Sequence, residues 1–407
     1  MKSKLMIQSK ILILWTASFL MAMGCSSDPS VEDQMETPTE GQNPKPEEPS
    51  ETVSYKEKAK GTYDMIQELY AKGSLYKENY PEQSGEREYS YLWPYVGMLT
   101  AGNVLYELGY EQSILDKEFS GLEAYYDNRS NLPTYQAYPV SGGSTDHYYD
   151  DSAIVAMELI DAYKNTGDNF YLDRAKSVTD FIMSGEDSRL GGGLYWFEGE
   201  SENCTSGPNC MKAANTSAYA AFVTSKMYQI TNNTQYLAFA KRVYEWNYET
   251  LRDPSDNLYW NDINIGTEQI NTTKWTYNAA LMIMSGINLY EITDDQKYLN
   301  QSIETARSAY SKFTKVVNGR LFYQTNDPWF NVELLDAFIQ LSEYDDKSND
   351  YVAVFKDNVD YAWENARNSN GQFYEDWSGN SQGRYFWLLH QAALIEAYGR
   401  IALYEQS

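Results

Sequence analysis

The stretch DAYKNTGDNFYL at residues 161–172 recurs as KMYQITNNTQYL at 226–237 and as NLYEITDDQKYL at 288–299. The copies begin 65 and 62 residues apart. Each copy closes one apolar segment, crosses a short polar turn and opens the next, which indicates two helices joined by a tight turn. Internal repetition at this spacing is typical of stacked supersecondary units. The repeat therefore predicts an all-α domain built from helix pairs.

Apolar positions with a helical period extend this pattern to twelve helices. The even-numbered helices are apolar on nearly all sides, whereas the odd-numbered ones are amphipathic. Because a helix that is apolar all round is buried and an amphipathic one lies outside, we expect an (α/α)6 toroid with six inner and six outer helices. An open solenoid of helix pairs is the alternative. The expected helices are 54–72, 92–108, 113–127, 150–165, 169–184, 212–230, 234–252, 275–291, 295–314, 328–343, 349–368 and 384–404.

The connections between the expected helices alternate in length. Short turns follow the inner helices, and all long loops then lie on the face of the toroid where the inner helices begin. Functional residues concentrate on such loops, and the partial positive charge of helix N-termini favours carboxylates there. We therefore expect the functional site on this face. The long loops are 128–149, 185–211, 253–274, 315–327 and 369–383.

Two adjacent acids, Asp150 and Asp151, lie where the loop 128–149 meets an inner helix. Adjacent acids also occur at 294–295 and 345–346, but these lie in short turns, where we expect them to cap outer helices. The position of the first pair on the long-loop face distinguishes it from the other two. It is a candidate catalytic pair, and capping of the inner helix is the alternative.

Such a pair suits hydrolysis of a glycosidic bond, which uses two carboxyl groups. Neighbouring residues have Cα atoms about 3.8 Å apart, and their side chains can diverge to the roughly 5 Å that a retaining enzyme needs. Two close carboxyl groups also separate each other's pKa values, so that one is ionised while the other keeps its proton. That division supplies a nucleophile and a general acid.

Four motifs on the expected loop face resemble glycoside hydrolase family 76, the endo-α-1,6-mannanases, and the resemblance extends from about residue 55 onward. It implies the (α/α)6 toroid and a consecutive aspartate pair that acts with retention. Carried over to this chain, Asp150 is the nucleophile and Asp151 the general acid/base. The motifs are, in order, YDDS at 149–152, GGGLYW at 191–196, KAANT at 212–216 and WTYN at 275–278.

The same motifs contain the candidate residues for binding sugar. Aromatic rings can stack on the C–H faces of mannose, and asparagine amides can bond to its hydroxyl groups; plain packing and helix capping are the alternatives. The sequence departs from the usual family pattern with SAI at 152–154 and AA at 279–280, which puts subsite shape and linkage preference in question. The candidates are Tyr149, Trp196, Asn215, Trp275, Tyr277 and Asn278.

The composition limits the kind of partner. The 58 acidic and 32 basic side chains give a net charge of −26, which argues against nucleic acid, because its binding needs Lys and Arg, and against polyanionic sugars. The aromatic content of 15% suits a neutral carbohydrate. We expect no cofactor and no metal site, because Cys204 and Cys210 have no nearby histidine. In an oxidising compartment a disulfide between these two cysteines is expected.

The N-terminal residues predict export and a lipid anchor. Residues 1–24 are basic and then apolar, as in a signal peptide, and they end before Cys25, as in the lipobox of bacterial lipoproteins. Residues 25–53 form an acidic, Pro-rich tether that cannot bury a core. We expect a catalytic domain at 54–407, held to the outer membrane of a Gram-negative bacterium only by lipid. The cell surface is favoured over the periplasmic face.

Taken together, these features predict a monomeric glycoside hydrolase that cleaves within α-1,6-linked mannan. A different class of function is a surface lipoprotein that binds mannan or another glycan on the same scaffold without cleaving it. A third alternative is another toroid enzyme: scarce histidine disfavours an epimerase, and the negative charge disfavours an uronyl hydrolase.

Overall fold

The computed structural model describes residues 53–129, 131–200, 204, 210–323 and 327–406. The expected signal peptide, the lipidated Cys25 and nearly all of the tether lie outside the described residues. Within the described part of the chain, no helix is both long enough and apolar enough to cross a membrane.

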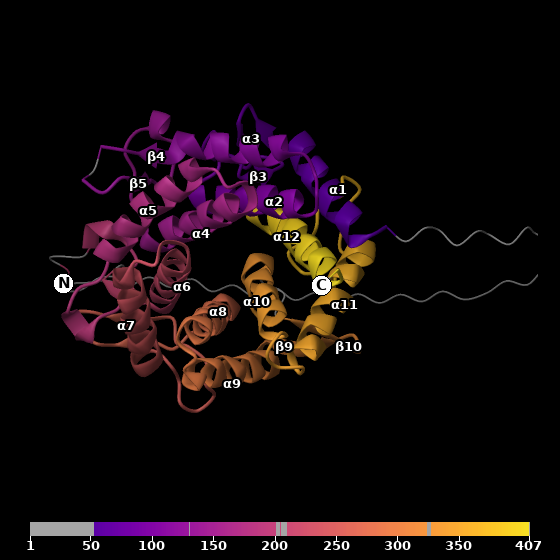
Figure 1. Cartoon of the computed structure of the whole chain (residues 1–407). Coiled ribbons are helices and arrows are strands. Elements are labelled where there is room, and N and C mark those ends of the chain that lie inside the picture. Colours follow the sequence, from indigo (N-terminus) through magenta and orange to yellow (C-terminus); the bar gives the residue numbers. More distant parts are fainter. Residues whose placement is uncertain (1–52, 130, 201–203, 205–209, 324–326, 407) are drawn as a thin grey trace, which may run out of the picture. The chain divides into compact units, whose positions relative to one another are not determined.

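Six inner helices form a closed ring in the described domain (Figure 1). Each inner helix contacts the next, and the last contacts the first, so the chain forms a toroid rather than an open solenoid. The inner helices are α2 (Leu92–Glu107), α4 (Tyr149–Thr166), α6 (Ala214–Thr231), α8 (Thr276–Thr293), α10 (Pro328–Leu341) and α12 (Leu388–Tyr404).

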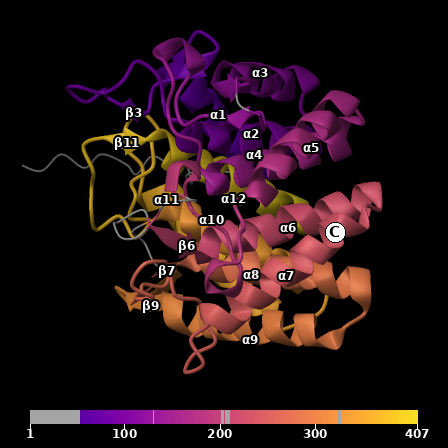
Figure 2. The same cartoon turned by 90° about the vertical axis from the view of Figure 1, so that its left-hand side faces the viewer.

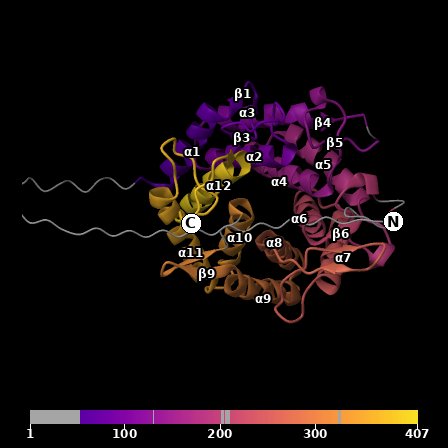
Figure 3. The same ribbon diagram turned by 180° about the vertical axis from the view of Figure 1, so that it is seen from behind.

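The outer helices surround this ring, as the view from behind also shows (Figure 3). In α8 every residue from Thr276 to Leu289 is buried, whereas α9 buries one face only, at Tyr298, Leu299, Ser302, Thr305, Ala306, Ala309 and Phe313. Burial of a single face in α9 is the amphipathic pattern of a surface helix. The outer helices are α1 (Tyr55–Leu69), α3 (Gln112–Leu122), α5 (Asn169–Ser184), α7 (Thr234–Thr250), α9 (Gln296–Phe313) and α11 (Ser348–Asn365).

The repeated turn has one local structure in its three copies. Its first residue ends an inner helix in the left-handed conformation, and its second accepts a hydrogen bond from the backbone N–H two residues on, which caps the next outer helix. The pairs are Gly167 with Asp168, Asn232 with Asn233, and Asp294 with Asp295.

The expected capping by residues 345–346 is wrong. Helix α11 begins at Ser348, and its N-cap is Lys347, which makes no side-chain capping bond. The carboxyl group of Asp345 instead lies 3.6 Å from the guanidinium group of Arg307 on α9. This turn therefore departs from the repeated pattern.

Short strands in the loops gather at one end of the domain, where the inner helices begin (Figure 2). Strand β6 (Met211–Ala213) lies directly before α6 and pairs with β7 (Asp262–Asn264). Strand β11 (Phe386–Trp387) lies directly before α12 and pairs with β3 (Asn79–Tyr80). The strands are β1 (Ala71–Lys72), β2 (Leu75–Tyr76), β3 (Asn79–Tyr80), β4 (Tyr126–Asp127), β5 (Thr134–Tyr135), β6 (Met211–Ala213), β7 (Asp262–Asn264), β8 (Ile270–Asn271), β9 (Thr314–Val317), β10 (Arg320–Tyr323) and β11 (Phe386–Trp387).

All twelve expected helices are present, and the (α/α)6 architecture is confirmed. The largest differences, of three to five residues, are at four ends, one of which is Asn365 in place of 368 at the end of the eleventh helix. The first helix stops at Leu69 because β1 follows, and the third stops at Leu122, where a single 3-10 turn begins. The last helix starts at Leu388 rather than 384, because Phe386 and Trp387 pair with β3.

Candidate active site

A cavity of about 800 Å³ opens where the inner helices begin. Its position follows from the fold, because equivalent residues of successive inner helices face the same space. The second residue of five inner helices lines the cavity: Trp93, Asp150, Asn215, Tyr277 and Trp329.

The N-cap residues of the inner helices also contribute to the wall of this cavity. Among the six inner helices, four N-caps are aromatic and line the cavity, and none of the four makes a side-chain capping bond. By contrast, the N-cap of α10, Asp327, does cap its helix and does not line the cavity. The four aromatic side chains line the cavity and do not cap their helices. We call them the aromatic rim: Tyr91, Tyr148, Trp275 and Trp387.

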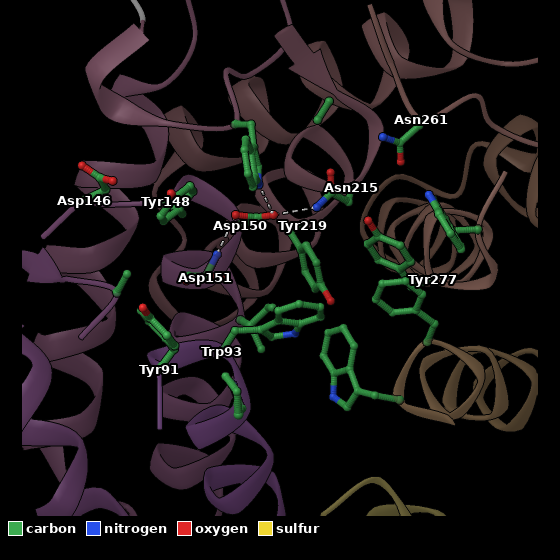
Figure 4. A pocket seen from close by; sticks show the side chains of 18 of the residues that line it. Tyr91, Trp93, Asp146, Tyr148, Asp150, Asp151, Asn215, Tyr219, Asn261 and Tyr277 are labelled. Carbon is green, nitrogen blue, oxygen red and sulfur yellow. Dashed lines mark hydrogen bonds between the residues drawn. The ribbon is translucent and has the colours of Figure 1, made fainter. Parts of the chain in front are cut away.

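The two aspartates lie in the middle of the cavity wall, near the start of α4 (Figure 4). Neither is the N-cap residue of α4, because Tyr148 occupies that position. The Oδ2 atom of Asp150 accepts hydrogen bonds from Asn215 Nδ2 at 2.8 Å and from Trp196 Nε1 at 2.9 Å. Its Oδ1 atom accepts one from the backbone N–H of Asp151 at 3.0 Å.

Burial raises the pKa of Asp150 to about 6, and the three hydrogen-bond donors oppose that rise. The pKa of Asp151 is raised well above its ordinary value, first by burial and then by the charge of Asp150. Since only Asp150 receives stabilising donors, the negative charge of the pair resides on Asp150 and the proton on Asp151 near neutral pH. The pair thus combines an ionised carboxylate with a protonated carboxyl group.

Trp196 is held against Asp150 by pairing of two loops. The backbone N–H of Tyr149 donates to Trp196 O at 3.0 Å, and that of Glu198 donates to His147 O at 3.1 Å. His147 Nδ1 also lies 2.8 Å from the carboxylate of Glu198. The hydrogen bond from the Trp196 indole to Asp150 therefore depends on the contacts that hold the Trp196 loop against the segment before α4.

The GGGLYW loop is fixed by the buried Lys212, which begins the KAANT motif. Its ammonium group donates to Gly192 O at 2.6 Å, to Arg189 O at 2.8 Å and to Asp187 Oδ1 at 2.7 Å. Nearby, Cys204 and Cys210 are joined by a disulfide, with Cα atoms 5.6 Å apart. The resemblance motifs thus order the loops around the aspartates.

Four of the six candidate sugar-binding residues line the cavity, and two do not. Trp196, Asn215, Trp275 and Tyr277 face it. The ring of Tyr149 turns away and stacks on Phe181, with centroids 4.7 Å apart. Asn278 is fully buried within α8. These last two are therefore placed outside the cavity.

Several residues that line the cavity are not predicted by the sequence motifs. All of them except Asn261 lie at the starts of inner helices, so alignment of the six inner-helix starts would have found them, whereas Asn261 lies in the loop before β7 and has no such signal. The aromatic ring of Trp93 lies 5.0 Å from that of Trp387 and 5.9 Å from that of Trp329, centroid to centroid. The missed residues include Tyr91, Trp93, Asn261, Trp329, Phe330 and Trp387.

The sequence model of glycosyl hydrolase family 76 matches residues 54–326, which contain the aspartate pair and all four motifs. The chain belongs to glycosyl hydrolase family 76. This membership identifies the chain as a glycoside hydrolase. The toroid of this chain also matches solved structures of family 76 proteins. A family 76 α-mannanase from Bacteroides thetaiotaomicron is 29% identical, with a TM-score of 0.77 over 87% of this chain and 96% of that one.

Two further relatives are more distant in sequence. An inactive variant of an α-1,6-mannanase from Salegentibacter sp. HEL1_6, solved with α-1,6-mannotriose, is 21% identical, with a TM-score of 0.72, and the match covers 86% of this chain and 100% of that one. A mannan endo-1,6-α-mannosidase from Candida albicans is 24% identical over 234 residues, which are 52% of this chain. The match spans only 50% of that curated relative.

Proposed function

We propose that this family 76 member is an endo-acting α-1,6-mannanase that hydrolyses its substrate with retention of configuration. The observation that carries this proposal is that the two aspartates have different hydrogen-bond partners. The carboxylate of Asp150 accepts three hydrogen bonds, and none of these donors bonds to the carboxyl group of Asp151. The α-1,6-mannan specificity named for several relatives supports the substrate class. An inactive Salegentibacter variant carries Asn at two adjacent aspartates, which supports a catalytic role for an adjacent pair.

In the first step, a carboxylate oxygen of Asp150 attacks the anomeric carbon of a mannosyl unit. Asp151 donates its proton to the glycosidic oxygen as the bond between that oxygen and the anomeric carbon breaks. The products are a mannosyl ester on Asp150 and a shortened chain with a free hydroxyl group. In the second step, Asp151 takes a proton from water, the water oxygen attacks the anomeric carbon, and the ester bond to Asp150 breaks.

The cavity extends to both sides of the aspartates, which supports cleavage within a chain. Tyr91 and Asp146 lie on one side of Asp150, and Asn261 and Tyr277 lie on the other (Figure 4). Sugars on both sides of the scissile bond can therefore contact the protein. Aromatic side chains on each side supply apolar surface for neutral sugar rings.

Asparagine substitution tests the two roles. Asp150→Asn and Asp151→Asn should each lower kcat/KM on linear α-1,6-mannan by at least about 10³-fold, because each step needs both groups. Asp346→Asn, in an adjacent acid pair outside the cavity, is the matched control and should leave activity unchanged. Circular dichroism checks the fold. Near-wild-type activity in either active-site variant would contradict the mechanism.

We also propose that the protein is an outer-membrane lipoprotein with lipid on Cys25, and that it acts as a monomer. The lipobox-like MAMGC at 21–25 supports the anchor. Cys25→Ala should release the protein from membranes and abolish labelling by a radioactive fatty acid. Retention of label in that variant would rule out this anchor.

A further inference from the structure

One member of the aromatic rim, Tyr91, is unusually exposed. Its exposed fraction is 40%, whereas the other three members of the rim are half-buried. As the N-cap of α2 it makes no side-chain capping bond. An exposed ring at this position serves neither the core nor the helix end, yet it lines the cavity.

The ring of Tyr91 contacts two other side chains, Tyr138 and Arg87. Its centroid lies 5.6 Å from that of the buried Tyr138, in an edge-to-face arrangement. The guanidinium carbon of Arg87 lies 4.5 Å from the centroid of Tyr138 and 5.4 Å from that of Tyr91. Such contacts restrict the rotation of an aromatic side chain before any ligand arrives. A ring that is already ordered loses less entropy on binding.

The backbone of Tyr91 is tied to the rest of the rim. Its N–H donates to Glu78 Oε2 at 3.1 Å, and Trp387 Nε1 donates to the other oxygen of the same carboxyl group at 3.2 Å. The next backbone N–H, of Leu92, donates to Ala137 O at 2.9 Å. Tyr91 therefore has a fixed place on the cavity wall that also holds Asp150.

We propose that Tyr91, supported by Tyr138 and Arg87, is a distal sugar-binding platform that makes the enzyme favour longer mannan chains. The occupant is a neutral mannosyl unit of the chain whose scissile bond lies at the aspartates, and its C–H face stacks on the tyrosine ring. This inference rests on the proposed α-1,6-mannanase function. It adds a residue that determines chain-length specificity.

Kinetics on α-1,6-manno-oligosaccharides of two to six units test the platform. Tyr91→Ala should lower kcat/KM by about tenfold on the hexasaccharide, chiefly through KM, and by less than about twofold on the shortest cleaved substrate. Tyr91→Phe should keep near-wild-type values at every length, because the ring does the binding. Tyr344→Ala is the control, since Tyr344 is comparably exposed, at 37%, but lies outside the cavity.

A loss that is absent, or equal at every chain length, would overturn the platform. Failure of the wild-type protein to cleave any of these substrates would instead refute the proposed function. Binding distinguishes the two cases further. In an Asp150→Asn, Asp151→Asn background, titration calorimetry should show about tenfold weaker binding of the hexasaccharide when Tyr91→Ala is added, and the unchanged affinity of Tyr91→Phe provides the comparison.

Discussion

At the residue scale, the central feature is that two adjacent aspartates have different surroundings. Asn215 and Trp196 both donate hydrogen bonds to the carboxylate of Asp150. By contrast, burial and the charge of Asp150 both raise the pKa of Asp151. Adjacent residues of a helix point about 100° apart, so the two side chains reach different environments despite their adjacency. In the proposed mechanism, this difference allows Asp150 to act as the nucleophile and Asp151 as the acid.

The pH dependence of kcat/KM should be bell-shaped. Activity should fall as the pH drops below about 6, because Asp150 then becomes protonated, and should fall again at high pH as Asp151 loses its proton. The two limbs belong to the coupled pair as a whole. Initial rates across the pH range at low substrate concentration measure both limbs. Full activity retained at pH 4 would contradict this assignment.

Removal of one donor should move the acid limb. Trp196→Phe deletes the indole N–H that stabilises ionised Asp150, so the pKa of Asp150 rises and the limb shifts upward by up to about one pH unit. Trp377→Phe is a suitable control, because that buried indole lies outside the cavity. An acid limb at the same pH in Trp196→Phe and wild type would show that this bond does not set the titration.

At the element scale, inner and outer helices begin differently. Four outer helices have Ser, Asp or Asn N-caps whose side chains accept backbone hydrogen bonds. The aromatic rim replaces such caps at four inner helices. The inner helices therefore give up capping bonds at the positions where the cavity gains aromatic surface.

This contrast predicts opposite effects of two alanine substitutions. Asp295→Ala should lower the free energy of unfolding by about 1 kcal/mol, because the cap of α9 is lost, and should leave kcat/KM unchanged. Trp275→Ala removes no capping bond but takes an aromatic surface from the cavity. Trp275→Ala should lower kcat/KM several-fold, without the loss of unfolding free energy that removal of a capping bond causes. Denaturant unfolding and steady-state kinetics on both variants measure this.

The helices were predictable from sequence, because periodicity and repeated turns are local signals. The residues that face the cavity were harder to predict. Tyr149 and Asn278 lie next to cavity residues in sequence, but one residue along a helix turns a side chain by about 100°, and both point elsewhere. Trp93 and Trp329 carry no motif of their own. Their role depends on the register of helices distant in sequence, which only the closed ring supplies.

At the scale of the whole molecule, the core of the toroid holds buried acids as well as apolar side chains. Glu158 on α4 accepts hydrogen bonds from Thr100 at 2.7 Å and from Asn103 at 2.8 Å. Burial raises its pKa to about 8, and the charge of Asp161 adds to the rise. Glu396 on α12 is buried as well, with a pKa raised to about 7, chiefly by burial. The folded domain therefore holds protons that the unfolded chain releases.

The stability of the domain should consequently fall as pH rises from about 4.5 to 8. Over that interval Glu158 stays protonated in the folded state but ionises in the unfolded chain, so unfolding is increasingly favoured. Glu158→Gln cannot ionise, and its stability relative to wild type should improve by a few kcal/mol across the interval. The exposed Glu304→Gln is the control. Urea unfolding at pH 5 and 8 measures the difference, and parallel pH profiles for Glu158→Gln and wild type would contradict it.

The most direct test of the whole account is the anomeric configuration of the first product released from α-1,6-mannotetraose. Proton NMR during the first minutes of reaction distinguishes the two anomers before they interconvert. Double displacement through Asp150 predicts that the α-anomer appears first, followed by slow equilibration. The β-anomer appearing first would contradict the nucleophilic role of Asp150, and an uncleaved tetrasaccharide would contradict the α-1,6-mannanase assignment.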